Sequence, residues 1–333
     1  MPIPSTMHAV AYNNPNNDLT WAAVPTPIPA AGELLIRVAA AGVNRPDLLQ
    51  RAGLYPPPTG HSPILGLEVA GHVVALGAGV NPQDWQLNDT VCALTNGGGY
   101  AEYVCVPDGQ CLPIPKGLSL KEAACLPEAL FTLWAHLFLR AELRGGERLL
   151  VHGAAGGIGH LAIQLAKAFG VGVLALVSSK EKAQFVRRIN GGGRVLAEWR
   201  TQNWPAWIRE MTNGDGVNVV LDHHGGPLLA ENLSVLAPEG RLLVIGQMGG
   251  TTGEIPLNHL LTKRLSIMGA VLRPRANEFK AMVAWELYQR VWPLLEQGRI
   301  KPHLHATLPM TQAAQAHQQM QDNSVLGKLV LTP

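Results

Sequence analysis

The stretch ERLLVHGAAGGIGHLAIQLAKAFGVGVLALV, residues 147–177, restricts the fold of this 333-residue chain more than any other segment. An apolar strand ends at His152, a glycine-rich turn follows, and a helix is expected to continue to Phe169. Apolar residues on this helix recur at the spacing of one continuous stripe packed against a sheet: Ile158, Leu161, Ala162, Leu165, Ala166 and Phe169. A second apolar strand follows at once, so the segment predicts a complete βαβ unit.

The turn between this strand and this helix predicts dinucleotide binding. The missing side chain at Gly156 lets the backbone approach a pyrophosphate, and Gly159 lets the helix pack closely on the strand. The helix N-terminus adds free N–H groups and a favourable dipole for phosphates. Ala154 stands where the GxGxxG fingerprint has its first glycine, so the prediction depends on the strands and helix around the turn as well.

The end of the second strand bears on which dinucleotide is bound. A carboxylate about 20 residues after the turn would bind the ribose 2′-hydroxyl of NAD. Here the strand runs into Ser178-Ser179-Lys180-Glu181-Lys182. Two hydroxyls and two ammonium groups suit a 2′-phosphate and favour NADPH. In the alternative, which stays open, a serine simply caps the next helix and the lysines lie in its solvated first turn.

The pattern along the chain predicts two domains. About 125 strand-rich and turn-rich residues come first, and strands then alternate with helices, as in a parallel sheet covered by helices on both faces. The closing GKLVL is expected to return to the first domain. Helices are expected over residues 126–143, ending near Gly145-Gly146, over Lys180–Ile189, near Pro227–Leu236 and over Glu278–Gln297.

Composition excludes several classes of protein. Hydrophobic residues make up 47% and charged residues 15%, enough for a buried core and unlike a disordered chain. A net charge of +2 gives no reason to expect nucleic acid or an anionic membrane as a partner. The N-terminus lacks a signal-peptide pattern, and no apolar run approaches about 18 residues. We therefore expect a soluble cytoplasmic protein.

The cysteines and histidines do not predict a metal site. Cys92, Cys105, Cys111 and Cys125 contain no CxxC pair, so we expect four reduced thiols, mostly buried. Twelve histidines include no HExxH motif, and the adjacent pair at 223 and 224 is expected to point to opposite faces of a strand.

Further motifs accompany the glycine turn: GVNRPDLLQRAGLYPPP, GLEVAGHVVALGAGV, GGGYAEYVCVP, IMGAVLRPR and the closing GKLVL. With them the chain resembles, over nearly its whole length, the zinc-independent quinone oxidoreductases of the medium-chain dehydrogenase/reductase superfamily, the group that includes zeta-crystallin. The resemblance implies an α/β fold: a GroES-like, partly barrelled, β-rich catalytic domain (1–126 and 272–333) and a doubly wound parallel-sheet Rossmann domain (127–271). It places the active site in the cleft between them and implies a homodimer paired through the strand around Ile267–Leu272.

The resemblance also implies a metal-free site for an acceptor. Zinc-using members carry a cysteine and a histidine where this chain has Val43-Asn44 and Leu67-Glu68. Asn44 and Tyr55 would bind and polarise the acceptor, the first from its amide and the second from its phenol. Glu68 is expected to anchor a backbone or an arginine and not to be catalytic. The alternative is that Tyr55 only packs its loop, which three prolines stiffen, and that Asn44 only caps a turn.

The resemblance assigns cofactor contacts to eleven residues: Thr132 to the nicotinamide amide, Gly156, Gly157 and Ile158 to the pyrophosphate, Ser178, Ser179 and Lys182 to the 2′-phosphate, Gly246, Gln247 and Met248 to the nicotinamide ribose, and Lys328 to closing over the cofactor from the tail. Relatives often have a tyrosine near the 2′-phosphate. Here Trp199 would stack in its place, or Glu198 would weaken the preference for NADPH. Trp199, Trp204 and Trp207 are otherwise expected to serve packing.

Reduction of quinones by NADPH, by hydride or electron transfer, is therefore the leading hypothesis. A quinone is a strong oxidant, so a few hydrogen bonds can stabilise the charge that develops on it. Two alternatives stay open: an NADPH-dependent reductase of α,β-unsaturated carbonyls, and a non-catalytic, crystallin-like nucleotide-binding protein. The expected partner is a small-molecule quinone or enone acceptor.

Overall fold

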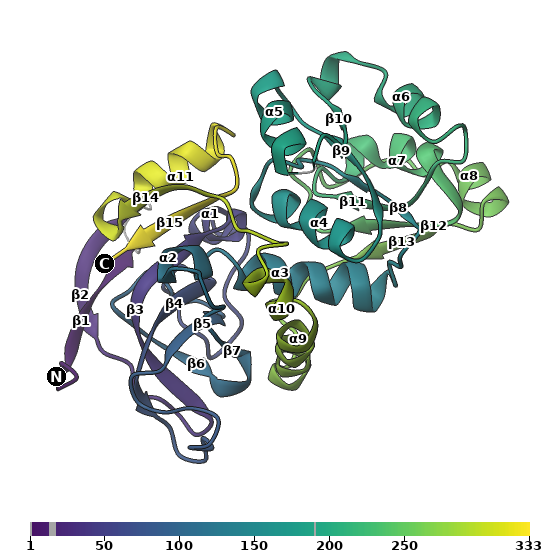
Figure 1. The fold of residues 1–333 in the computed structure, drawn as a ribbon. Helices are drawn as coiled ribbons and strands as arrows, with labels where there is room; N and C mark the ends of the chain where they lie inside the picture. The colour runs from purple at the N-terminus through teal and green to yellow at the C-terminus, as the bar shows by residue number, and fades with distance from the viewer. Residues whose placement is uncertain (1, 13–17, 190) are drawn as a thin grey trace. The chain divides into compact units, whose positions relative to one another are not determined.

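The computed structural model describes residues 2–12, 18–189 and 191–333 and divides the chain into two compact units (Figure 1). The first unit comprises Met1–Phe131, Arg273–Gly298 and Pro302–Pro333. The second comprises Thr132–Leu272 and Arg299–Lys301. The boundary expected after residue 126 therefore falls after Phe131, and the return to the first unit begins at Arg273.

The first unit is built on a seven-stranded sheet in the order β14-β15-β3-β4-β5-β7, with β6 paired to β3. Only the β14–β15 pair is parallel among these described strands. The last strand pairs with β3, which confirms that the end of the chain returns to this unit. The strands are β1 (Thr6–Ala11) and β2 (Thr20–Pro25), which form a separate hairpin, and β3 (Glu33–Val43), β4 (Glu68–Leu76), β5 (Thr90–Leu94), β6 (Tyr103–Pro107), β7 (Cys111–Pro113), β14 (Leu304–Pro309) and β15 (Lys328–Thr332).

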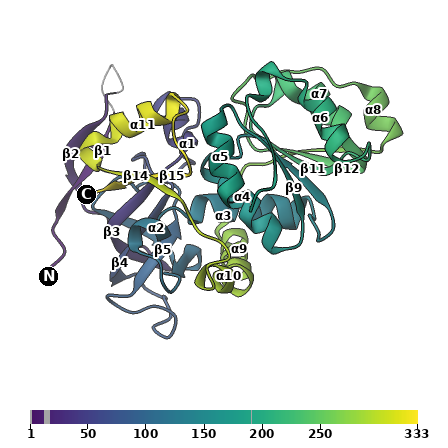
Figure 2. The ribbon, with the colours of Figure 1, turned by 45° about the horizontal axis from the view of Figure 1, so that its top comes forward.

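Short helices surround this sheet, and α11 lies alongside β14 and β15 (Figure 2). The single helix expected over Glu278–Gln297 is instead two helices that meet at Val291. Pro293 lies in the first turn of the second helix, and a proline there lacks the N–H that a continuous helix would need. The helices are α1 (Arg45–Arg51), α2 (Leu120–Ala123), α3 (Pro127–Leu133), α9 (Asn277–Arg290), α10 (Trp292–Glu296) and α11 (Ala313–Gln321).

The second unit is a six-stranded parallel sheet in the order β10-β9-β8-β11-β12-β13. Taken in chain order the strands read 3-2-1-4-5-6, which is the order of a doubly wound nucleotide-binding sheet and confirms the predicted fold class. The strands are β8 (Arg148–Val151), β9 (Gly172–Leu176), β10 (Arg194–Leu196), β11 (Val217–Asp222), β12 (Leu236–Val244) and β13 (Ser266–Gly269).

Helices cover both faces of the parallel sheet (Figure 2). The helix predicted after the glycine turn is α4, and α5 begins and ends where the sequence predicts. Trp199 and Trp204 are buried in the core with Trp207 packed against it, which confirms their packing role. The helices of this unit are α4 (Gly157–Ala168), α5 (Lys180–Ile189), α6 (Trp204–Met211), α7 (Leu229–Val235) and α8 (Leu257–Thr262).

Two further local expectations are wrong. The helix expected up to Gly145-Gly146 continues from α3 as a π-helix and ends at Arg140. The guanidinium of Arg241 donates to the carbonyl oxygen of Ala141 at 2.8 and 2.9 Å, so a side chain satisfies the helix end early.

The histidine pair at 223 and 224 does not point to opposite faces of a strand, because its ring centroids lie only 4.6 Å apart. Strand β11 has already ended at Asp222. The carboxylate of this aspartate accepts hydrogen bonds from the N–H groups of residues 224 and 225 at 2.8 and 3.0 Å, which turns the chain.

Three of the four cysteines are buried, and all four are free thiols. Within the described part of the chain, no helix has the length and apolar character needed to cross a membrane.

Candidate functional site

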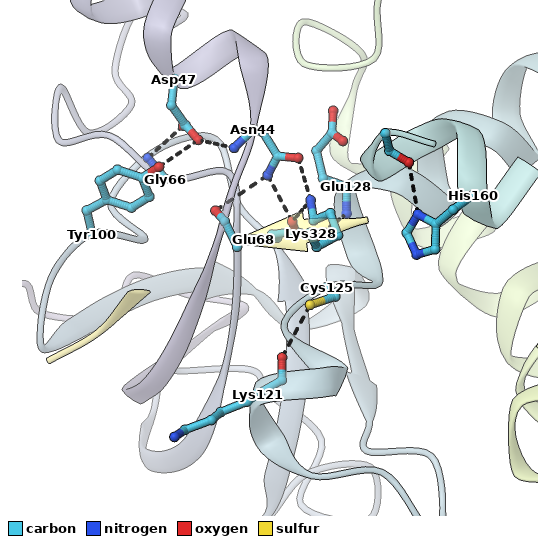
Figure 3. Close-up of polar contacts among 12 residues, drawn as sticks. Asn44, Asp47, Gly66, Glu68, Tyr100, Lys121, Cys125, Glu128, His160 and Lys328 are labelled. Atoms are coloured by element: carbon cyan, nitrogen blue, oxygen red, sulfur yellow. Dashed lines mark hydrogen bonds and ion pairs between the residues drawn. The ribbon is translucent and has the colours of Figure 1, made fainter. Parts of the chain in front are cut away.

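A buried polar network occupies one end of the sheet of the first unit (Figure 3). Asn44 follows β3, and Glu68 and Lys328 begin the antiparallel neighbours β4 and β15. The end of one strand meets the starts of its two neighbours, so three side chains far apart in sequence come together. The Asn44 Nδ2 donates to Glu68 Oε1 at 2.8 Å, and Lys328 Nζ donates to Asn44 Oδ1 at 2.6 Å and pairs with Glu68.

Glycine at position 42 leaves the space that this network needs. A Cβ there would lie 2.0 Å from Glu68 Oε1 and 2.6 Å from the carbonyl oxygen of Ala124. Any larger residue would therefore displace the buried carboxylate.

The network keeps its charges because they are paired. Burial by itself lowers the pKa of Lys328, but the carboxylates of Glu68 and Glu128 raise it above its ordinary value. The second carboxylate oxygen of Glu68 accepts from the backbone N–H of Glu128 at 2.9 Å. Glu68 therefore anchors a backbone, as expected, but its cationic partner is a lysine and not an arginine.

Asp47 links the network to helix α1. Its carboxylate accepts from the N–H of Asn44 at 2.8 Å, from the Tyr100 hydroxyl at 3.0 Å and from the N–H of Gly66 at 3.0 Å. Burial raises the pKa of Asp47 to about 6, although these hydrogen bonds and Lys328 lower it. The sequence analysis missed this residue, yet its position three residues after the helix cap was the available signal.

The contacts that the structure shows for Asn44 and Lys328 lie within the first unit, and the roles that the resemblance gives them toward the acceptor and the cofactor stay predictions. The amide of Asn44 donates to Glu68 and, at 3.5 Å, to the carbonyl oxygen of Gly42. Lys328 is buried with its ammonium group on Asn44 and Glu68, so it holds the buried polar network together in the first unit. Closing over a cofactor would require it to leave these partners.

Tyr55 lies on the proline-stiffened loop after α1, and its ring stacks against the guanidinium of Arg273, 5.4 Å from centroid to Cζ. Burial raises the pKa of Tyr55, which Arg273 opposes and Glu128 reinforces. Its hydroxyl makes no hydrogen bond to any residue that the structure describes. The phenol is therefore free to donate to an acceptor.

Glu128, which the sequence analysis also missed, lies in the first turn of α3. Burial raises the pKa of its carboxyl to about 7, with Lys328 opposing the shift and Glu68 and Asp47 adding to it. The carboxyl makes no ion pair or hydrogen bond within the described residues. A carboxyl that titrates near neutral pH can hold a proton and release it to a reacting group.

In the second unit, the glycine turn has the geometry predicted for a phosphate cradle. A Cβ on Gly159 would lie 2.5 Å from the carbonyl oxygen of Gly153, which confirms that this glycine lets α4 pack on the strand end. Gly156 caps α4, and a Cβ there would meet nothing closer than 3.4 Å. With open space at Gly156 and the first N–H groups of α4 at Gly157 and Ile158, the residues fit a pyrophosphate.

The predicted ribose contacts lie beside this turn, at the carboxyl end of the same sheet. The loop Gly246–Met248 follows β12, and the N–H of Met248 donates to the carbonyl oxygen of His223 at 3.0 Å. The His223 ring in turn fills the space above Gly153, where a Cβ would lie 2.1 Å from it. Doubly wound sheets bind their ligands at this edge. The nicotinamide contact of Thr132, which is buried in the last turn of α3, stays a prediction.

The residues after β9 combine both interpretations of their sequence. Ser179 Oγ accepts from the N–H of Lys182 at 3.2 Å, so this serine does cap α5. Lys182, however, is only 9% exposed and not solvated. Burial lowers its pKa, Glu181 raises it, and the charge of Arg200 lowers it further. Arg200, a second cation that the sequence analysis missed, is therefore close to the expected 2′-phosphate site, and the contact of Ser178 with the phosphate stays a prediction.

Trp199 and Glu198, expected near the 2′-phosphate, have partners within the second unit, and their roles toward the cofactor stay predictions. Trp199 is a core residue, and the guanidinium of Arg200 lies 4.7 Å from the centroid of its ring. Glu198 faces Lys180, with 3.9 Å between carboxylate and ammonium. Within the described part of the chain, no group of three or more His, Cys, Asp or Glu side chains is arranged to hold a metal ion.

Comparison with known proteins agrees with this geometry. The family model of the alcohol dehydrogenase GroES-like domain matches residues 30–116, and that of the zinc-binding dehydrogenase matches residues 157–287. Quinone oxidoreductase of Rattus norvegicus is 32% identical over 312 residues, which cover 92% of this chain and 91% of the relative.

Two solved structures are similar over the whole chain. One is described as an NAD-dependent alcohol dehydrogenase (29% identity, TM-score 0.84, covering 98% of this chain and 100% of that chain). The other is the CurK enoyl reductase (29% identity, TM-score 0.84, covering 99% of each chain). The chain therefore belongs to the medium-chain dehydrogenase/reductase superfamily of oxidoreductases, as the sequence motifs predict.

Proposed function

We propose that the protein reduces quinones with NADPH and without a metal. The observation that carries the proposal is the free phenol of Tyr55, half-buried and stacked on a guanidinium. A donor held in this way can hydrogen-bond to a quinone oxygen as negative charge develops there. Identity of about 30% to quinone oxidoreductases over nine-tenths of the chain supports this choice of acceptor.

The roles within the chain follow from the two units. When bound, NADPH supplies the hydride, and the residues of the glycine turn, the loop after β12 and the first turn of α5 would hold it. Tyr55 donates to the acceptor oxygen. The network of Asn44, Glu68 and Lys328 fixes the start of α1 and the backbone of Glu128, and contact of the Asn44 amide with the acceptor is a further part of the proposal.

Replacing Tyr55 with Phe tests the donor role. We expect turnover with an ortho-quinone to fall about tenfold, less than the ~10²–10³ lost with an oxyanion-hole donor, because a quinone accepts electrons readily. The Michaelis constant for NADPH should stay within twofold, since the phenol is not assigned to the cofactor. Unchanged turnover would reject the donor role.

The choice of NADPH rests on the cations after β9. Lys182 and Arg200 would neutralise a 2′-phosphate, and Ser179 would add a hydroxyl. Michaelis constants measured with both dinucleotides test this choice, and Lys167→Ala on α4 is a matched control for Lys182→Ala. A preference for NADH of tenfold or more would contradict it.

The metal-free part of the proposal rests on the residues at the two places where zinc users have ligands. Val43-Asn44 and Leu67-Glu68 contain neither a cysteine nor a histidine there. Dialysis against a strong chelator is expected to leave turnover unchanged. A loss of activity that zinc restores would contradict this part.

Reduction of α,β-unsaturated carbonyls is the second candidate, and Glu128 favours it. Such a reaction needs a proton at the α-carbon, and a carboxyl with a pKa of about 7 can supply one. The similarity to an enoyl reductase structure also supports it.

NADPH oxidation measured with an ortho-quinone and with a 2-alkenal separates the candidates. We expect higher turnover with the quinone than with the 2-alkenal. Glu128→Gln should change quinone turnover little, because solvent can protonate the quinone oxygens. Higher turnover with the 2-alkenal, lost in Glu128→Gln, would favour the second candidate. NADPH binding without turnover of either compound would leave the non-catalytic alternative.

A further inference from the structure

Two buried cations of the first unit, Arg273 and Lys280, have no carboxylate partner among the described residues. Arg273 is 7% exposed, and its Nη2 donates to the carbonyl oxygen of Asn96 at 2.7 Å. Its Nε and Nη1 are buried and have no hydrogen-bond partner within the described residues. Unpaired donors on a buried guanidinium are costly, so they call for a ligand or another explanation.

Lys280, on α9, is hydrogen-bonded to the backbone of Arg273 and to the same asparagine, Asn96. Its side chain is fully buried, and its ammonium donates to Asn96 Oδ1 at 2.7 Å and to the carbonyl oxygen of Arg273 at 2.8 Å. Neither residue forms an ion pair with any described carboxylate. Burial and the charge of Arg273 lower the pKa of Lys280 to about 8, so the ammonium still carries charge at neutral pH.

The surrounding groups do not neutralise this pair. Burial lowers the pKa of Arg273, and the charges of Tyr55 and Asp47 only oppose this shift. The two carboxylate oxygens of Asp47 already accept hydrogen bonds from Asn44, Gly66 and Tyr100. The ring of His61 lies 3.5 Å from the Asn96 amide and adds no negative charge.

The unused donors belong to the guanidinium on which the Tyr55 ring stacks. Gly97 lets the backbone pass close to it, because a Cβ there would lie 3.3 Å from Arg273 Nη2 and 2.5 Å from the carbonyl oxygen of Ser62. The surrounding backbone therefore holds the Arg273 guanidinium in place beside Tyr55, the proposed hydrogen-bond donor to the acceptor.

We propose that Arg273, supported by Lys280, is an anion-binding subsite that takes a carboxylate or sulfonate substituent of the acceptor. A guanidinium with free donors binds such planar or tetrahedral anions more strongly than it binds neutral groups. The substrate class is then an acidic quinone. The identity of the ligand rests on the proposed function, whereas the preference for an anion rests on the two cations alone.

Anthraquinone-2-carboxylate and anthraquinone-2-carboxamide are a matched pair of probes that differ in one charge. In wild type we expect kcat/KM with NADPH to favour the carboxylate at least tenfold. In Arg273→Met this ratio should fall to within about twofold of unity, and in Lys280→Met it should fall partway. Arg275→Met, an exposed neighbour stacked on Phe279, should keep the wild-type ratio. A ratio near unity in wild type, or one unchanged in Arg273→Met, would overturn the subsite.

Calorimetric titration of the same probes without NADPH separates this inference from the proposed function. If neither probe is reduced but the carboxylate binds at least tenfold more tightly, and Arg273→Lys retains part of that difference, the subsite stands and quinone reduction fails. Equal affinities of both probes in wild type would reject the subsite even if both are reduced.

Discussion

At the scale of single residues, the polar network of the first unit consists of buried charged groups that are paired with one another. Glu68 has three partners, namely the amide of Asn44, the ammonium of Lys328 and the backbone N–H of Glu128. Each of these groups is fixed by the others, so removing one charge leaves the rest buried without compensation.

Lys328→Met tests this dependence. Leaving the Glu68 carboxylate unpaired is expected to lower the free energy of unfolding by about 3–5 kcal/mol, measured as a fall in Tm by calorimetry. Adding Glu68→Gln should recover part of the loss, because the buried negative charge is then absent. Arg264→Met breaks an exposed pair and should change stability by less than about 1 kcal/mol. Equal losses of unfolding free energy in Lys328→Met and Arg264→Met would contradict this prediction.

Glu128 makes stability depend on pH. Its native pKa of about 7 lies above the ordinary value of 4.5, so the folded protein binds this proton more tightly than the unfolded chain. The stabilisation is fully present below about pH 4.5 and is lost as pH rises to about 7, with a slope of at most about 1.4 kcal/mol per pH unit. Glu128→Gln should remove this component, while the smaller one of Asp47 remains. Parallel pH profiles of Tm in wild type and variant would show that the carboxyl does not titrate in this range.

At the scale of elements, the structure matches the sequence prediction where all the determinants of an element lie within one short segment. The strand, turn and helix from Arg148 to Ala168 carry apolar spacing, glycines and a helix cap within about 20 residues, and the structure follows them. Expectations failed where a distant residue decides the outcome, as when Arg241 satisfies Ala141 and ends a helix early. Glu128 and Arg273 were missed for the same reason, because strand pairing and a return of the chain give them their neighbours.

Gly159 is the glycine on which the packing of α4 depends most directly. Gly159→Ala would bring a Cβ within 2.5 Å of a backbone oxygen and 2.7 Å of the Cα of Ala154. Moving backbone atoms should cost about 1–3 kcal/mol of stability and weaken dinucleotide binding at the helix N-terminus. Tm and fluorescence titration with NADPH measure both. Gly172→Ala on β9, whose Cβ would have ordinary contacts at 3.6 Å, is the matched control. An undisturbed titration in Gly159→Ala would show that the helix start can shift without loss.

At the scale of the whole molecule, each unit carries one half of the proposed reaction. The second unit, with its glycine turn and parallel sheet, would hold the nicotinamide cofactor, and the first would hold the acceptor. The first unit is assembled from both ends of the chain. The network of Asn44, Glu68 and Lys328 requires β15 to pair with β3, so both ends of the chain contribute to it.

The parallel sheet has an edge that a second copy of the chain can extend. Strand β13 pairs with β12 on one side only among the described strands, and its neighbourhood exposes Ile267 (38%) and Val271 (53%). An edge strand with unpaired backbone groups and exposed apolar side chains is a template for pairing. We propose a homodimer through this edge, in agreement with the expectation for residues 267–272.

Sedimentation equilibrium should therefore give twice the 35.6 kDa mass of the chain. The double change Ile267→Lys with Val271→Lys places like charges on both copies at the shared edge and should shift the protein to monomers. Leu261→Lys, which alters an exposed apolar residue on α8 of the same unit, should leave the dimer intact. A wild-type monomer at micromolar concentration, or a dimer that survives the double change, would place any contact elsewhere. The buried polar network of Asn44, Glu68 and Lys328 lies wholly within one chain. The monomeric variant should therefore keep its buried Lys328–Glu68 pair and the pH dependence of stability that Glu128 produces.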